Sequence, residues 1–168
     1  MLYSIEQIAT HEAGHALAHI LTGLPFSIVT IDPQLAGHSV GKSLGYIQPI
    51  IPYDRKESDN YSKLLPDDFF QCFSEDVTIV AGYVAQRIFT KEFDRNGSKK
   101  DIKILYSNKM MNHPEPFRMK YRDFLIAYTF MLFQMNQNKI MIRKIADELL
   151  KHKTLGYEEV IMIVERID

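Results

Sequence analysis

The chain has 168 residues, 46% of them hydrophobic, which suits one compact domain with its own core. Its 20 Lys and Arg residues balance 21 Asp and Glu residues, so a net charge of −1 provides no basic surface for nucleic acid or an anionic membrane. The single cysteine, Cys72, excludes an internal disulfide, and the longest apolar run, residues 124–135, is shorter than the ~18 residues of a membrane span, so we expect a cytoplasmic protein without a membrane span.

The first predicted element is a helix that begins after Ser4. Ser4 and Gln7 have the spacing of a capping box, in which each side chain bonds the other residue's backbone N–H. Apolar residues then recur at helical spacing. Gly23 and Pro25 end the pattern, because glycine favours a helix C-terminus and proline cannot continue one.

Two short strands are predicted next. Residues 26–31 are rich in β-branched side chains, and residues 43–48 form a second strand-like run that continues into an extended, proline-containing segment. A connection containing Gly and Pro, residues 32–42, joins the two runs, and a polar surface loop is predicted over residues 53–65. These features predict a small β-hairpin or sheet inserted after the first helix.

Helical patterns occupy the remainder of the chain. Pro66 suits the first turn of a helix that is predicted to end near Thr90. Ser98 is the expected start of a helix that ends near Met111. Further helices are predicted over residues 117–135 and 138–152, and a last short one after Gly156. The predicted fold class is therefore mainly α, in a single domain over residues 1–168.

The chemistry-bearing motif lies inside the first predicted helix, where His11, Glu12 and His15 form an H-E-x-x-H pattern. Residues four apart share one helical face, so the two imidazoles can bind one Zn²⁺ at about 2.0–2.1 Å each. Glu12 can then act as the general base for a zinc-activated water. The pattern predicts a zinc metallopeptidase site.

A catalytic zinc needs a third protein ligand. His19 is the nearest candidate, but it lies about 80° around the helix from His11 and is predicted to pack or to face solvent. The remaining candidates are carboxylates on other predicted helices, namely Glu75, Asp76 and Asp101.

A competing motif lies between the predicted strands. Residues 36–43 read Ala-Gly-His-Ser-Val-Gly-Lys-Ser, a relaxed form of a phosphate-binding loop that includes Lys42. Such a loop must open a helix whose N-terminus meets the phosphates. The residues after Ser43 are strand-like instead, so we expect a glycine-rich connection rather than a nucleotide site.

Several stretches occur together in one order and with compatible spacing. They are His-Glu-Ala-Gly-His-Ala at 11–16, Leu-Gly-Tyr-Ile-Gln at 44–48, Ala-Gly-Tyr-Val-Ala-Gln-Arg-Ile-Phe at 81–89, Gly-Ser-Lys-Lys-Asp-Ile at 97–102, Ile-Ala-Asp-Glu-Leu-Leu at 145–150 and Thr-Leu-Gly at 154–156. Over nearly the whole chain, this combination resembles the peptidase domain of FtsH-type ATP-dependent zinc metalloproteases.

The resemblance implies roles for particular residues. Asp101, which closes the Gly-x-x-x-Asp element, stands where that family has its third zinc ligand. Gln86 stands where a carboxylate is usual, and its oxygen is expected to accept a ring N–H from a ligand histidine. Tyr83 also departs from the family pattern, which has Arg there.

The resemblance further implies a zincin-like helical metallopeptidase domain that binds one Zn²⁺ per chain. The expected substrates are peptides or unfolded protein segments. FtsH-type proteases carry transmembrane helices and an ATPase ring, which these 168 residues lack. The protein is therefore expected either to act on flexible substrates alone or to receive them from a separate ATPase. The alternative is a catalytically weak or inactive peptidase-fold module that binds a protein partner.

Overall fold

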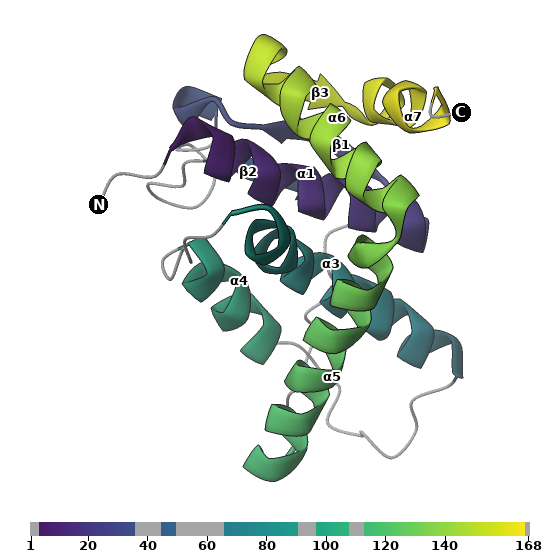
Figure 1. Ribbon diagram of the computed structural model, residues 1–168. Coiled ribbons are helices and arrows are strands. Elements are labelled where there is room, and N and C mark those ends of the chain that lie inside the picture. The colour runs from purple at the N-terminus through teal and green to yellow at the C-terminus, as the bar shows by residue number, and fades with distance from the viewer. Residues whose placement is uncertain (1–3, 36–44, 50–65, 91–96, 108–112, 167–168) are drawn as a thin grey trace.

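Figure 1 shows the computed structural model of the protein, which describes residues 4–35, 45–49, 66–90, 97–107 and 113–166. The chain is mainly helical and carries a small antiparallel sheet, as the sequence predicts. The helices are α1 (Ile5–Thr22), α3 (Pro66–Phe89), α4 (Gly97–Tyr106), α5 (Glu115–Gln134), α6 (Asn136–His152) and α7 (Tyr157–Glu165). The strands are β1 (Phe26–Thr30), β2 (Tyr46–Pro49) and β3 (Thr154–Gly156).

Local signals fix both ends of α1. The Gln7 backbone N–H donates to Ser4 Oγ at 3.3 Å, and the Ser4 N–H donates to Gln7 Oε1 at 3.1 Å, which is the predicted capping box. At the other end, Gly23 has a φ of 71°, in the left-handed region that glycine enters without steric cost. The prediction for this helix is confirmed at both ends.

The sheet has the strand order β2-β1-β3, with β1 antiparallel to both neighbours. The strand predicted over residues 26–31 is β1, and the one predicted over 43–48 is described from Tyr46 onward. β3 was not predicted, because three residues between two helices carry no recognisable strand period. It is held by pairing with β1, where the hydroxyls of Thr30 and Thr154 lie 2.7 Å apart.

The core has two parts that meet along α3. The C-terminal half of α3 packs with α1, α6 and the sheet, around buried residues such as Leu17, Val84 and Ile145. The N-terminal half of α3 packs with α4 and α5, around Leu105 and Leu125. Figure 1 accordingly shows α3 between α1 on one side and the α4 and α5 pair on the other. Helix α3 therefore joins the two halves of the molecule.

Some boundaries differ from the predicted ones. Helix α4 ends at Tyr106 instead of near Met111. Helix α5 begins at Glu115 and accommodates Pro116 in its first turn, where a missing N–H costs no helical hydrogen bond. Helix α6 follows α5 directly, and the Asn138 side chain donates to the Leu132 carbonyl at 2.8 Å, which satisfies a carbonyl at the end of α5.

Two sequence interpretations lie outside the described residues: the phosphate-loop-like segment at 36–43 and the surface loop at 53–65. The side chain of Ser98, the expected cap of α4, lies outside them too. Among the helices of the described ranges, none combines the length and the apolar character needed to cross a bilayer.

Candidate metal centre

Helix α1 buries the H-E-x-x-H motif against α3. His11, Glu12 and His15 are 7%, 5% and 7% exposed. The two histidines are one helical turn apart, so their rings meet edge to face, with centroids 4.6 Å apart and an interplanar angle of 78°. Their Nε2 atoms lie 3.0 Å from each other. Both imidazoles thus present the same nitrogen to one point.

Asp101, on the first turns of α4, completes the group. Its Oδ2 atom lies 3.0 Å from His11 Nε2 and 3.5 Å from His15 Nε2. Three donors held tetrahedrally at about 2.0–2.1 Å from one Zn²⁺ would lie about 3.3–3.4 Å apart. The observed separations of 3.0 to 3.5 Å match this requirement closely. Among the described residues, these three form the cluster whose chemistry and spacing suit a metal ion.

The tautomer of His15 is fixed from outside the cluster. Its Nδ1–H donates to the Thr78 backbone carbonyl of α3 at 2.7 Å. With a metal bound, the ring would direct its Nε2 lone pair at the centre, as a metal ligand must. Without a metal ion, burial would raise the pKa of Asp101, but the charge on His15 and hydrogen bonds from His11 and His15 outweigh it and hold the pKa well below its usual range. The cluster is therefore built from two imidazoles and a carboxylate that stays ionised.

Glu12 lies beside the cluster in a dry environment. Burial raises the pKa of its carboxyl to about 8, while the charge on His15 lowers it and that on Asp101 raises it. Gly45, just before β2, lies directly against this carboxyl, so that a Cβ at Gly45 would overlap the Glu12 side chain. The residue before β2 thus lies against Glu12, which is next to the metal cluster.

Glycines allow the elements around the cluster to approach closely. A Cβ at Gly82 of α3 would lie 2.5 Å from His15 Nε2 and 2.6 Å from His11 Nε2, closer than real Cβ contacts. A Cβ at Gly14 of α1 would lie 2.5 Å from Ala85 Cβ. The sequence pattern alone indicates no role for either glycine. The Ala-Gly pairs at residues 13–14 and 81–82 were the available signal, since small residues mark close helix packing.

The other sequence-based ligand candidates lie elsewhere. His19 is 1% exposed, its Nδ1–H donates to the Leu24 carbonyl at 2.9 Å, and burial lowers its pKa to about 4. His19 therefore packs in the core, which is one of the two environments predicted for it; the other was solvent. Asp76 is buried and accepts a hydrogen bond from the Tyr121 hydroxyl at 2.9 Å, and Glu75 accepts one from the Gln71 side chain at 3.1 Å.

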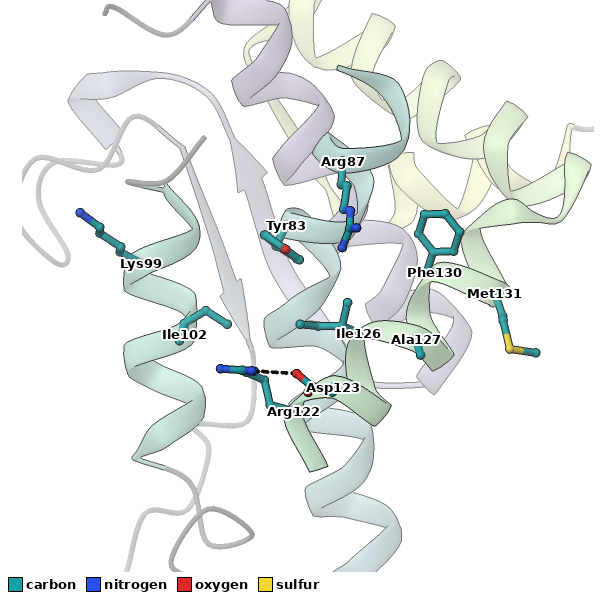
Figure 2. A pocket seen from close by; sticks show the side chains of 10 residues that line it. All are labelled: Tyr83, Arg87, Lys99, Ile102, Arg122, Asp123, Ile126, Ala127, Phe130 and Met131. Atoms are coloured by element: carbon teal, nitrogen blue, oxygen red, sulfur yellow. Dashed lines mark hydrogen bonds and ion pairs between the residues drawn. The ribbon is translucent and has the colours of Figure 1, made fainter. Parts of the chain in front are cut away.

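Gln86 lies one turn after Gly82 on the buried face of α3. Its side-chain N–H donates to the Gln7 backbone carbonyl at 3.1 Å, which ties α3 to the start of α1. The Gln86 side-chain oxygen is buried without a hydrogen-bond partner among the described residues, so the prediction that it accepts a ring N–H from a ligand histidine is wrong. Tyr83, the other departure from the family pattern, faces a pocket between α3, α4 and α5 (Figure 2).

Comparison with known proteins gives no match for this chain: no protein-family model matches it, and no curated protein matches it significantly.

Proposed function

We propose that the protein is a zinc metallopeptidase whose metal ligands are His11, His15 and Asp101. The observation that carries the proposal is the convergence of two imidazole nitrogens and one carboxylate oxygen, from α1 and α4, at mutual distances of 3.0 to 3.5 Å. Two neutral nitrogens and one anionic oxygen are a donor set typical of catalytic zinc, with a fourth position left for solvent or substrate.

The donors also suit a cation on electrostatic grounds. Without a metal ion, the positive charge of His15 and hydrogen bonds from both imidazoles compensate the ionised Asp101 oxygen, and a bound cation would replace these protons. Held by His11, His15 and Asp101, a Zn²⁺ ion would supply this charge, lower the pKa of its bound water to about 7 and polarise a carbonyl group.

Glu12 is the proposed general base. It follows a proposed ligand in the chain and lies at the edge of the cluster, so it can take a proton from a water molecule beside the metal without being a ligand itself. Its pKa of about 8 belongs to the buried carboxyl without a metal ion. A nearby dication favours the ionised form that a base requires.

Substrate is proposed to bind as an extended chain along β2. Within the described residues β2 is an outer strand of the sheet, and Gly45 at its start touches Glu12. A peptide added to this edge by backbone hydrogen bonds would therefore run past the base and the metal. An extended substrate means a peptide or an unfolded segment, taken up directly or delivered by a separate ATPase. The helix-plus-sheet arrangement supports a zincin-like domain, and the single Cys72 supports a cytoplasmic setting.

The alternative function is a zinc-binding module that recognises a protein without cutting it. The observation that favours it is Gln86, which makes a structural hydrogen bond to Gln7 at a position where FtsH-type peptidases usually have a carboxylate. This alternative shares the metal site with the peptidase and differs in turnover.

Metal content and hydrolysis of an unfolded, fluorescently labelled protein test both proposals. We expect one zinc per chain and zinc-dependent hydrolysis. Glu12→Gln should keep the zinc and abolish hydrolysis, whereas Glu158→Gln, an exposed control on α7, should change neither. A His11→Ala and His15→Ala double variant with full zinc content would exclude the metal site. Zinc binding without hydrolysis in the wild-type protein would favour the alternative.

A further inference from the structure

A second candidate site lies between α3, α4 and α5, and its lining residues differ from the proposed zinc ligands. A pocket of about 860 Å³ opens between α3, α4 and α5 (Figure 2). Tyr83 and Arg87 line it from α3, Lys99 and Ile102 from α4, and the remaining walls come from α5. Its volume lies in the range of small-molecule sites, about 300–1,000 Å³. None of the proposed zinc ligands lines it.

The walls of the pocket are mostly apolar. Ile102, Ile126 and Phe130 are half-buried, and each keeps part of its surface accessible inside the pocket. Met131, at the edge, is 70% exposed. A concave apolar surface favours an apolar ligand, because binding removes the apolar surface of both the pocket and the ligand from water.

The polar groups of the pocket carry an excess of positive charge. Figure 2 shows the guanidinium groups of Arg87 and Arg122 on either side of Ile126. Arg122 donates to Asp123 at 2.8 Å and to the Tyr106 hydroxyl at 3.1 Å, so its charge is already partly compensated. Arg87 has no ion pair within the described ranges. Charge complementarity therefore favours an anionic group near Arg87.

We propose that this pocket binds a free fatty acid, with its carboxylate at Arg87 and its chain along Ile126 and Phe130. A single apolar chain needs no hydrogen-bond partners, which suits walls built from helices whose backbone groups are already bonded within the helix. An extended peptide would have to bury unpaired backbone N–H and C=O groups on the same walls. The observations thus favour a single-chain amphiphile over an extended peptide. The proposal is independent of the zinc site.

Calorimetric titration of the full chain with octanoate, decanoate and dodecanoate, each below its micelle concentration, tests the proposal. We expect one saturable site per chain, with affinity rising by up to about fourfold for each added methylene. Decanol, which has the same length as decanoate but no charge, should bind on the order of tenfold more weakly. Absence of saturable binding, or equal affinity for decanol and decanoate, overturns the proposal.

Two variants locate the ligand. Arg87→Gln should weaken decanoate binding on the order of tenfold, whereas Arg166→Gln, an exposed arginine after α7, should leave it unchanged. Ala127→Trp should block the pocket from its exposed wall and abolish binding without lowering the melting temperature. Equal weakening in both arginine variants, or undiminished binding in Ala127→Trp, contradicts the assignment. So does binding of phosphatidylglycerol vesicles or of an acidic, apolar peptide without binding of free dodecanoate.

Discussion

Asp101 Oδ2 lies 3.0 Å from His11 Nε2, although the two residues belong to different helices that flank α3. The contact depends on Gly82, because any side chain there would occupy the space in which the two imidazoles meet. The proposed metal site is therefore a property of three helices, not of the H-E-x-x-H motif alone.

Replacing Asp101 by Asn should weaken zinc binding by about 10–100-fold or more, since it removes the anionic ligand and keeps the size of the side chain. Competition with a chromophoric chelator measures the affinity. Asp123→Asn, an exposed carboxylate on α5, is the matched control and should bind zinc like the wild-type protein. Unchanged zinc affinity in Asp101→Asn, with a less stable α4, would assign Asp101 a purely structural role.

Gly82→Ala should abolish zinc binding, because the added methyl group would lie 2.5 Å from His15 Nε2 and 2.6 Å from His11 Nε2. Gly156→Ala is the control: its Cβ would meet Glu159 Oε2 at 3.5 Å, an ordinary contact, so zinc content should be normal. Metal analysis of the two purified variants, with circular dichroism to verify folding, makes the comparison. A folded Gly82→Ala protein with one zinc per chain would show that the histidines do not meet as described.

Gly45→Ala should separate metal binding from hydrolysis. The new methyl group would displace the Glu12 carboxyl, because the Glu12 side chain supplies the three atoms nearest to it. Zinc content should stay at one per chain, and the hydrolysis rate should fall by at least tenfold and by at most the 10²–10⁴-fold that a general base contributes. Steady-state hydrolysis at saturating zinc is the measurement. An undiminished rate would remove Glu12 from the proposed role.

His19 should make folding stability depend on pH. Burial lowers the pKa of His19 from 6.5 to about 4, so below pH 6.5 the unfolded chain gains a proton that the folded protein does not. Stability from this source is full above pH 6.5 and falls as the pH decreases to about 4, by up to about 3 kcal/mol. Urea unfolding of zinc-free protein should show a shallower decline for His19→Gln. Exposed His152→Gln should keep the wild-type pH dependence, and an unchanged decline in His19→Gln would refute the assignment.

Tyr121→Phe should destabilise the protein by about 1–3 kcal/mol, because the Asp76 carboxylate is fully buried and would lose its hydrogen bond from the Tyr121 hydroxyl. Tyr128→Phe on the same helix is the control, since the Tyr128 hydroxyl forms no hydrogen bond with a described residue. Chemical denaturation compares the two variants. Equal stabilities would mean that the buried hydrogen bond contributes nothing net.

Elements with local signals were predictable from the sequence. The capping box of Ser4 and Gln7 and the left-handed Gly23 act within one helical turn, so the sequence alone located both ends of α1. Strand β3 depends on pairing with β1 from the other end of the chain, and no local pattern announces such a partner.

In the candidate site, too, some residues were predictable from local sequence and others depend on tertiary packing. The spacing of His11 and His15 places them on one helical face by geometry. Asp101 was one carboxylate among several until the family resemblance selected it, because nothing in its own surroundings in the sequence specifies which helix α4 packs beside. The Thr78 carbonyl that orients His15 could not be predicted at all, since every residue has a backbone carbonyl and only the packing of α1 on α3 selects this one.

The strand order β2-β1-β3 determines when during synthesis each strand gains its pairing partners. On the ribosome, α1 with both histidines emerges first, Asp101 follows much later, and β1 gains its second neighbour only when residues 154–156 have been made. The segment that passes over Glu12 leads into β2, and β2 is anchored to β1. This segment is therefore fully supported only after residues 154–156 have been made, long after the histidines and the base of the proposed site.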